Sequence, residues 1–371
     1  MAMEGGGFAR REEQVTLELR AMYERHGYRK YRMSKFEAYE LYLENINFLK
    51  SRSIITFNGP DGRVLALRPD VTLSIVKNTR ADRASSEKFY YLENVYRLDK
   101  ASGAYREIAQ LGLEYLGARD AYATSEVLML AARTLNTIDP AGRMQLSHVG
   151  FLQSLMEGLG VTGEGRGELA RSIRRKNAHE LAATARALGL PPAATELLEG
   201  AAALSGAFRE TLARARAFAI TPSQTAALDE LEAVGAALEA RGAAQGLTLD
   251  FSLLGDMDYY SGVAFQGYVP GVPRAVLAGG GYAALLARFG RDIDAIGFAV
   301  YLNELSFLYE RGDVDDVDVL LIYGEADAPE RVARAAGRLI ERGLRVRCER
   351  RPPRELRAGR QMTLEEVEAD A

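Results

Sequence analysis

The side chains that could do chemistry in this sequence are carboxylates, arginines and tyrosines, because histidine and cysteine are scarce. The chain has three histidines, His26, His148 and His179, and one cysteine, Cys348. They show no HExxH-type spacing and no paired cysteines, and so do not predict a zinc site. The sequence also lacks a GxxxxGK[ST] phosphate loop and a GxSxG nucleophile motif. We expect neither a metal nor a cofactor.

Two segments with strand periodicity each carry polar side chains on one face. Residues 89–98 alternate so that Arg97 shares a face with aromatic residues, and residues 107–117 place Gln110 and Glu114 together. The link between the segments is rich in turn residues, which predicts a long antiparallel hairpin. Taken alone, a strand glutamate such as Glu114 is more often solvated or paired across strands than bound to a ligand. The hairpin is therefore a candidate ligand surface that needs further support.

Helical patterns lie on both sides of this hairpin. Residues 11–25 predict an amphipathic helix. From residue 145 to residue 247 the chain is dominated by Ala, Leu, Glu and Arg at helical spacing, which predicts a helical subdomain. Its best-marked helix runs from Thr221 to Gly242, with Thr221 and Gln224 in a capping-box pattern.

The second half of the chain predicts more strands and a small terminal unit. Between the helical subdomain and residue 311 we expect strands over 262–269 and 274–278, and a helix over 293–310. The C-terminal segment has a strand, helix and strand pattern over 317–323, 329–342 and 344–348. Residues 351–371 are rich in charge and show no further strand pattern. The elements predict an antiparallel sheet flanked by helices, followed by a small α/β unit.

Length and composition limit the class of protein. A chain of 371 residues is longer than the usual domain of about 100 to 150 residues, so we expect more than one domain. A net charge of -4 gives no whole-chain signature of nucleic-acid binding. No apolar run approaches the roughly 20 residues that span a bilayer, and the N-terminus lacks a signal-peptide pattern. We expect a cytoplasmic protein that does not bind a membrane.

Six short segments resemble the catalytic core of class II histidyl-tRNA synthetases, in the same order and approximate spacing. They are Leu67–Thr72, Tyr96–Arg97, Gln110–Glu114, Asp258–Tyr260, Ala278–Tyr282 and Gly297–Ala299. Each is a weak signal alone, but six in register with a helical insertion between them are specific. The resemblance implies an α+β fold with a class II aminoacyl-tRNA synthetase-like antiparallel sheet flanked by helices.

The resemblance also implies a domain order and an oligomer. The synthetase-like core would occupy residues 1–144 and 248–310, interrupted by a helical insertion over 145–247. A truncated C-terminal α/β unit would occupy residues 314–371, too short for a complete anticodon-binding domain, so tRNA is not expected as a partner. A self-dimer is implied because the family's core dimerises.

A pocket for free L-histidine is a further implication of the resemblance. Histidine carries an ammonium, a carboxylate and an imidazole, so its pocket needs an acidic end, a basic end and a polar group for the ring. The implied contacts are Asp70, Thr72 and Gln110 near the amino group, Arg97 near the carboxylate, and Glu114, Tyr260 and Tyr282 around the imidazole. Tyr259 is also implied as a histidine-binding residue.

Three departures from the synthetase pattern argue against amino-acid activation. The last core motif of the enzymes, Gly-Phe-Ala-x-Gly-x-Glu-Arg-Leu, has Glu304 in place of its arginine, and a carboxylate there would repel ATP phosphates. Gly255 occupies the position of the catalytic arginine before the tyrosine pair. Ser34 replaces the usual proline of the first motif, which affects the expected dimer interface. We expect a chain without catalytic residues.

These departures are similar to those of a group of synthetase paralogues, the regulatory subunits of ATP phosphoribosyltransferase. The resemblance implies a partner, the short catalytic subunit that begins histidine biosynthesis, in a hetero-octamer. It also implies that the chain is required for the partner's activity and can sense histidine for feedback. Two other interpretations stay open at this stage: a divergent histidyl-tRNA synthetase, and a synthetase-like enzyme or binder for another amino acid.

Overall fold

The chain forms two compact units, one of residues 15–305 and the other of residues 306–371 together with residues 1–14. The computed structural model describes residues 11–49, 53–99, 102–118, 120–254, 260–309 and 315–369. Within these ranges, no helix has both the length and the apolar character needed to cross a membrane.

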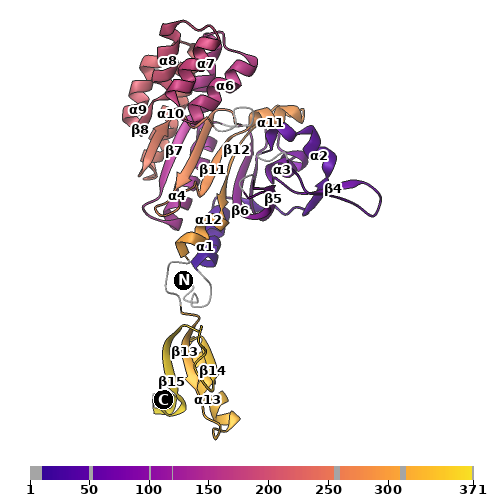
Figure 1. Cartoon of the computed structure of the whole chain (residues 1–371), viewed down its shortest axis with the longest axis vertical. Coiled ribbons are helices and arrows are strands. Elements are labelled where there is room, and N and C mark those ends of the chain that lie inside the picture. The colour runs from indigo at the N-terminus through magenta and orange to yellow at the C-terminus, as the bar shows by residue number, and fades with distance from the viewer. Residues whose placement is uncertain are drawn as a thin grey trace. The chain divides into compact units, whose positions relative to one another are not determined.

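Nine strands in the described part of the chain form the central sheet of the larger unit (Figure 1). Their order is β1-β5-β6-β12-β11-β10-β7-β9-β8. In chain order they are β1 Arg29–Lys30, β5 Glu87–Leu98, β6 Tyr105–Gly117, β7 Arg143–His148, β8 Ser205–Ala207, β9 Leu247–Asp250, β10 Val263–Tyr268, β11 Leu277–Gly281 and β12 Asp294–Tyr301. Neighbours are antiparallel except for the parallel pairs β1–β5 and β7–β9. The predicted antiparallel sheet is confirmed for its central strands.

The predicted hairpin is the longest pairing in this sheet. Strands β5 and β6 pair from Glu87 opposite Leu116 to Leu98 opposite Tyr105. Directly paired residues project from the same face, so Tyr91 lies over Gly112. Pairing of β6 with β12 then places Gly297 beside Glu114.

Helices α1 (Arg11–Arg25) and α4 (Ala121–Ile138) belong to one face of the sheet. The predicted helix over residues 11–25 is confirmed. The Tyr23 ring lies 6.1 Å from the Phe298 ring in β12, and its hydroxyl is 2.8 Å from Thr134 Oγ1 in α4. Phe298 projects from the face opposite to that of its neighbour Gly297. Gly297 and Glu114 therefore lie on the face of the sheet opposite to these two helices.

A small antiparallel sheet and three short helices border the β5–β6 hairpin. The strands are β2 Phe36–Ala38, β3 Thr56–Asn58 and β4 Val64–Leu67, and the helices are α2 Tyr39–Glu44, η1 Ile46–Phe48 and α3 Thr72–Asn78. The side chain of Arg68 is 1% exposed and links this sheet to β5, because it donates to the Asn94 carbonyl and to Glu93 at 2.5 Å. The residues that follow Arg68, including Asp70, are thereby held against the hairpin.

The segment between β7 and β9 is helical, with one short strand, β8. Its helices are α5 Val149–Gly158, α6 Gly163–Arg174, α7 Ala178–Ala187, α8 Pro192–Ala202, α9 Phe208–Ala215, η2 Arg216–Phe218 and α10 Pro222–Ala240. The predicted capping box of Thr221 and Gln224 is present. The helices gather beside β7 and β8 (Figure 1). Division of the larger unit into a core over 1–144 and 248–310 and an insertion over 145–247 remains a prediction.

The prediction of a helix over 293–310 is wrong for its first half, which is strand β12. Helix α12 covers only Leu302–Tyr309, and residue 310 lies outside the described ranges. Ile296, Phe298 and Val300 are buried and alternate with small residues, which is the period of a strand. The strand predicted over 274–278 is shifted, because β11 begins at Leu277 and continues through the glycines to Gly281. Helix α11 (Ala283–Arg288) follows it.

The C-terminal unit contains more structure than the sequence predicts. Strands β13 Val317–Ile322 and β14 Val346–Glu349 and helix α13 Pro329–Glu341 match the predicted pattern. Strand β15 (Ala358–Thr363) and helix α14 (Leu364–Ala369), in the segment thought to lack strands, complete the sheet in the order β14-β13-β15. Both neighbours of β13 are parallel to it.

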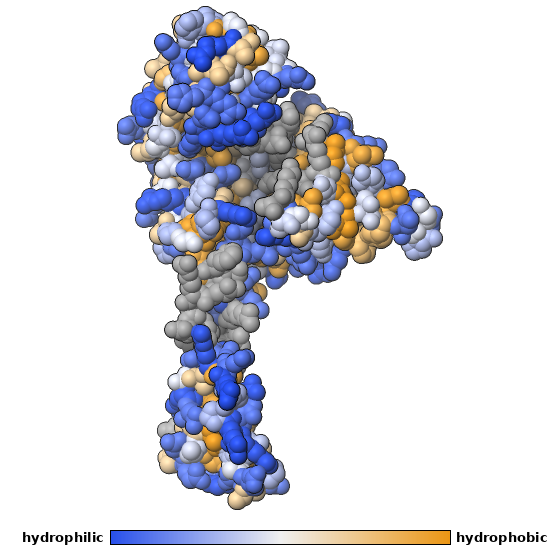
Figure 2. All heavy atoms as spheres, in the orientation of Figure 1, coloured by the Kyte–Doolittle hydropathy of each residue, from blue (hydrophilic) through white to orange (hydrophobic). Residues whose placement is uncertain are grey.

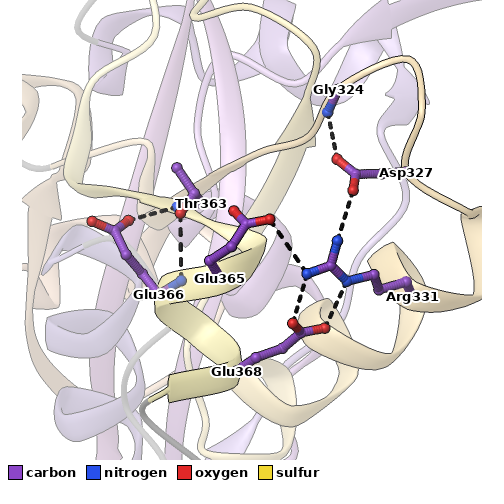
Figure 3. Close-up of polar contacts among 7 residues, drawn as sticks. All are labelled: Gly324, Asp327, Arg331, Thr363, Glu365, Glu366 and Glu368. Carbon is purple, nitrogen blue, oxygen red and sulfur yellow. Dashed lines mark hydrogen bonds and ion pairs between the residues drawn. The ribbon is translucent and has the colours of Figure 1, made fainter.

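One arginine joins helices α13 and α14 (Figure 3). Arg331 in α13 donates to both carboxylate oxygens of Glu368 in α14, at 2.8 and 2.7 Å. It also donates to Asp327 at 2.9 Å and Glu365 at 3.3 Å. These ion pairs lower the pKa of Glu368 below its usual value, chiefly through the hydrogen bond from Arg331. The charges of residues 351–371 therefore belong partly to an ordered helix.

Candidate functional site

A cavity lies on the face of the sheet that carries Glu114 and Gly297, above β5, β6, β11 and β12. Its lining residues are Asp70, Thr72, Tyr91, Arg97, Gln110, Glu114, Tyr260, Ala278, Gly279, Gly280, Tyr282, Gly297, Phe298, Ala299 and Tyr301. We refer to it as the sheet pocket. Seven of the eight residues that the sequence proposed as histidine contacts line it, and the eighth, Tyr259, lies outside the described residues.

Glu114 is the buried acid of the sheet pocket. It is 3% exposed, and its two oxygens accept hydrogen bonds from the Thr72 hydroxyl at 2.8 Å and the Tyr282 hydroxyl at 2.7 Å. Burial raises the pKa of Glu114 to about 8, and the charge of Asp70 adds to the rise, while the two hydroxyl contacts oppose it. Burial therefore favours the protonated form of this carboxyl.

Asp70 and Arg97 provide an acidic and a basic group next to each other. The Arg97 Nη2 and Asp70 Oδ2 atoms are 3.8 Å apart, and each side chain is 12% exposed. Asp70 Oδ1 accepts from the Leu73 amide at 3.0 Å in the first turn of α3, and Arg97 Nε donates to the Pro69 carbonyl at 2.9 Å. Both groups are held by backbone contacts and keep further hydrogen-bonding atoms for a ligand.

Glycines make room for the polar groups of the pocket. A Cβ atom at Gly297 would lie 1.7 Å from Glu114 Oε2, and one at Gly112 would lie 2.0 Å from the Tyr91 ring. A Cβ at Gly280 would lie 2.5 Å from the Tyr260 ring. Real Cβ contacts of this length do not occur, so the pocket depends on glycine at these positions.

Two tyrosines in the sheet pocket were missed by the sequence reasoning. Tyr91 and Tyr301 line the cavity beside the predicted residues. Burial raises the pKa of Tyr91 well above its usual value, with smaller contributions from the charges of Glu114 and Asp70. The alternation of β5 places Tyr91 on the same face as Arg97, which is the signal that could have identified it.

Two of the three positions that depart from the synthetase pattern lie in the described residues, and both make polar contacts within the chain. Glu304 Oε1 lies 3.8 Å from Arg274 Nη1, with the glutamate 23% exposed. The Ser34 hydroxyl accepts from the Phe36 amide at 3.1 Å, and the Ser34 carbonyl accepts from Arg68 at 3.1 Å. Gly255 lies outside the described residues.

Comparison with known proteins identifies the family. The histidyl-tRNA synthetase family model matches residues 7–305. The ATP phosphoribosyltransferase regulatory subunit of Anaeromyxobacter dehalogenans strain 2CP-1 is 34% identical over 306 residues, covering 80% of this chain and 86% of that protein.

Solved structures agree in fold. An ATP phosphoribosyltransferase regulatory subunit/histidyl-tRNA synthetase from Bacillus halodurans has a TM-score of 0.75 and 26% identity, covering 91% of this chain and 88% of that one. A chain of the ATP phosphoribosyl transferase complex of Thermotoga maritima has a TM-score of 0.61 and 16% identity, covering 78% and 96%. The class II synthetase-like fold expected from the sequence is confirmed. The chain belongs to the histidyl-tRNA synthetase family and, within it, to the ATP phosphoribosyltransferase regulatory subunits.

Proposed function

We propose that this chain is the non-catalytic subunit that a short ATP phosphoribosyltransferase catalytic subunit requires for activity, and that it senses L-histidine. Membership of the regulatory-subunit family carries the proposal, and the Thermotoga maritima relative of the same fold comes from a complex of this transferase. The retained sheet pocket supports the sensing role, because its polar groups match the three polar parts of histidine.

The proposed binding mode assigns each part of histidine to one region of the sheet pocket. The ammonium lies beside Asp70, with Thr72 and Gln110 next to it, and the carboxylate pairs with Arg97. The imidazole lies against Glu114 and the tyrosines Tyr260 and Tyr282. Glu114 supports this orientation because a buried carboxyl with a raised pKa can exchange a proton with an imidazole that titrates near neutrality.

Assembly is the second part of the proposal. We assign the chain to a self-dimer within a hetero-octamer of regulatory and catalytic subunits. Support for a self-contact comes from apolar side chains exposed around β2, β3 and β4, among them Phe36 at 46%, Phe57 at 38% and Val64 at 36%. The Phe36 and Phe57 rings touch edge to face, and hydrophobic side chains gather over this part of the surface (Figure 2).

The proposal predicts catalytic silence. With L-histidine, ATP and magnesium, the purified chain should show no histidine-dependent exchange of pyrophosphate into ATP. The reason is that Gly255 and Glu304 replace the two arginines with which the synthetases stabilise phosphate charge. The measurement is a pyrophosphate exchange assay beside an authentic histidyl-tRNA synthetase. Robust exchange that survives removal of contaminating synthetase would favour a divergent synthetase instead.

The test of the regulatory role is reconstitution with the short catalytic subunit encoded in the same genome. Mixing the two purified subunits should form a complex and raise phosphoribosyltransferase turnover. L-histidine should then lower this turnover with a coupling free energy of about 1 to 3 kcal/mol, or roughly 5- to 150-fold. The effect is limited because histidine can shift the equilibrium between an active and an inactive state only by the difference in its affinity for the two states.

Two variants separate assembly from sensing in this assay. Asp70→Ala and Glu114→Ala should weaken feedback while the complex and its basal turnover persist. If both variants stay fully inhibited by histidine, feedback arises in the catalytic subunit. If the subunits neither associate nor change activity on mixing, the regulatory role is wrong whether or not histidine binds.

A further inference from the structure

The turn between α6 and α7 holds a lysine in a backbone conformation that favours glycine. Lys176 has a φ of 51°, and it is the one non-glycine residue with positive φ in the described ranges. The Lys176 amide donates to the Ile173 carbonyl and the Asn177 amide to the Ser172 carbonyl. These two bonds define a Schellman helix end with Lys176 at its left-handed position.

Six other helices in the described ranges end in the same motif with glycine at that position. Helices α1, α5, α7, α10, α11 and α13 are followed by Gly27, Gly160, Gly189, Gly242, Gly290 and Gly343, with φ of 82, 76, 75, 65, 67 and 82°. Glycine adopts this conformation without steric cost, whereas lysine does not. A strained residue persists where its surroundings fix it, and such residues cluster at functional sites. The side chain of Lys176 is therefore a candidate functional group.

The Lys176 side chain reaches a buried carboxylate at the end of β9. Its Nζ atom donates to Asp250 Oδ2 at 2.7 Å, and the lysine side chain is 61% exposed while that of Asp250 is 7% exposed. Asp250 Oδ1 accepts from the amide and hydroxyl of Ser252, at 3.0 and 2.5 Å. An ammonium has three donors, and Asp250 accepts from one of them. The remaining donors lie at the exposed end of the side chain.

This ion pair lines two adjacent cavities. The larger, of about 480 Å³, lies above β7, β9 and β10, and we refer to it as the lysine cavity. The smaller, of about 270 Å³, lies among α6, α7 and α8 and has a mainly apolar lining that includes Ile173 and Leu181. Among the residues that the structure describes, Lys176 and Asp250 alone are common to both linings.

The lysine cavity opens on the same face of the sheet as the sheet pocket. Gln266 in β10 pairs with Ala278 in β11, which pairs with Ala299 in β12. Ala278 and Ala299 line the sheet pocket, and Gln266 lines the lysine cavity. Paired residues share a face, so two separate cavities lie side by side over one sheet.

The lysine cavity has two exposed cations at its rim, and its lining also includes the buried carboxylate of Asp250. Arg174 and Lys176 are exposed and lie two residues apart where α6 ends. The floor carries the side-chain amides of Gln145 and Gln266, which occupy directly paired positions of β7 and β10. It also carries the hydroxyl of Tyr268, which donates to Gln266 at 2.6 Å. With two cations and one carboxylate, the lining has a net positive charge.

We propose that the lysine cavity binds a phosphorylated sugar. The phosphate lies at the rim between Arg174 and Lys176, which form charge-assisted hydrogen bonds with its oxygens. The sugar hydroxyls face the amides and the tyrosine of the floor, since groups that both donate and accept match a polyol better than an apolar ligand. This site is distinct from the proposed histidine pocket, and occupancy of one does not require the other.

The test is titration calorimetry of ribose 5-phosphate into the full chain at low salt, with three single variants. Lys176→Gly removes the ammonium and suits the backbone, so the fold should be retained. Arg174→Gln removes the second cation. Arg175→Gln is the matched control, because Arg175 lies between the two, pairs with Glu180 at 3.4 Å and does not line the cavity.

The expected result is binding by the parent chain and by Arg175→Gln with similar affinity. Lys176→Gly and Arg174→Gln should each bind at least about tenfold more weakly, since each loses a charge-assisted contact. Ribose without phosphate, and inorganic phosphate without ribose, should each bind more weakly than ribose 5-phosphate. Absence of ribose 5-phosphate binding, or equal losses in all three variants, would overturn the proposal. L-histidine titrations of the same variants report on the sheet pocket separately.

Discussion

Replacing Glu114 by alanine should weaken L-histidine binding by about 2 to 5 kcal/mol, or roughly 30- to 5,000-fold. Glu114 is 3% exposed and is fixed by hydrogen bonds from Thr72 and Tyr282. In the proposed binding mode, its loss leaves the imidazole N–H and both hydroxyls without their buried acceptor, and a buried donor without a partner costs its full desolvation. Titration calorimetry of the chain and of its complex with the catalytic subunit measures the effect.

Two further variants, one control and one conservative substitution, help to interpret the histidine affinity of Glu114→Ala. Glu107→Ala changes an exposed glutamate of the same strand, next to Asn94 and Tyr96, and should leave histidine affinity unchanged. Glu114→Gln keeps the shape and the acceptor oxygen but cannot exchange a proton, so its affinity should lie between those of the parent and Glu114→Ala. Unchanged affinity in Glu114→Ala would show that this carboxyl is a structural residue of the sheet and not a ligand contact.

Gly297→Ala should abolish histidine binding and destabilise the larger unit by about 3 kcal/mol, the upper end for overpacked cores. The new Cβ would lie 1.7 Å from Glu114 Oε2 and 2.5 Å from the Leu113 carbonyl. The second contact is with the backbone of a paired strand, so a change of side-chain rotamer cannot relieve it. Thermal or urea unfolding measures the loss of stability, and calorimetry measures the loss of binding.

The matched control is the same substitution in open space. Gly167 lies within α6, is exposed, and a Cβ added to it would meet no atom within 4 Å. Gly167→Ala should raise stability by about 0.5 to 1 kcal/mol, because alanine loses less backbone entropy than glycine in a helix. Histidine binding should not change. If Gly297→Ala were as stable as the parent, the close approach of β12 to Glu114 would not exist in solution.

Local signals predicted the elements that flank the site better than those beneath it. The β5–β6 hairpin was predicted from its alternating residues and turn-rich link, and α10 from the capping box of Thr221 and Gln224. Each of those patterns is formed by residues that are close together in the sequence. Strand β12 was misread because its pocket-facing positions are Gly297 and Ala299, which carry no polar alternation against the apolar residues between them.

The site was predictable as a set of residues but not as a geometry. The motif segments placed Asp70, Arg97 and Glu114 together through resemblance, and the structure brings their side chains into one cavity. The raised pKa of Glu114 depends on burial between strands far apart in the sequence, and no local pattern reports burial. Strand β15 was missed for a related reason, since its exposed Arg360 and Gln361 resemble a charged tail until they pair with β13.

The parallel pairing of β7 with β9 has a consequence for the order of folding. Residues 144–146 pair with residues 247–249, and helices α5 to α10 all lie within the loop that this pairing closes. Loop-closure entropy opposes so distant a contact until the intervening chain is ordered, whereas the β5–β6 hairpin closes over a short link. The rate at which this edge of the sheet closes is therefore tied to the rate at which the helical segment becomes compact.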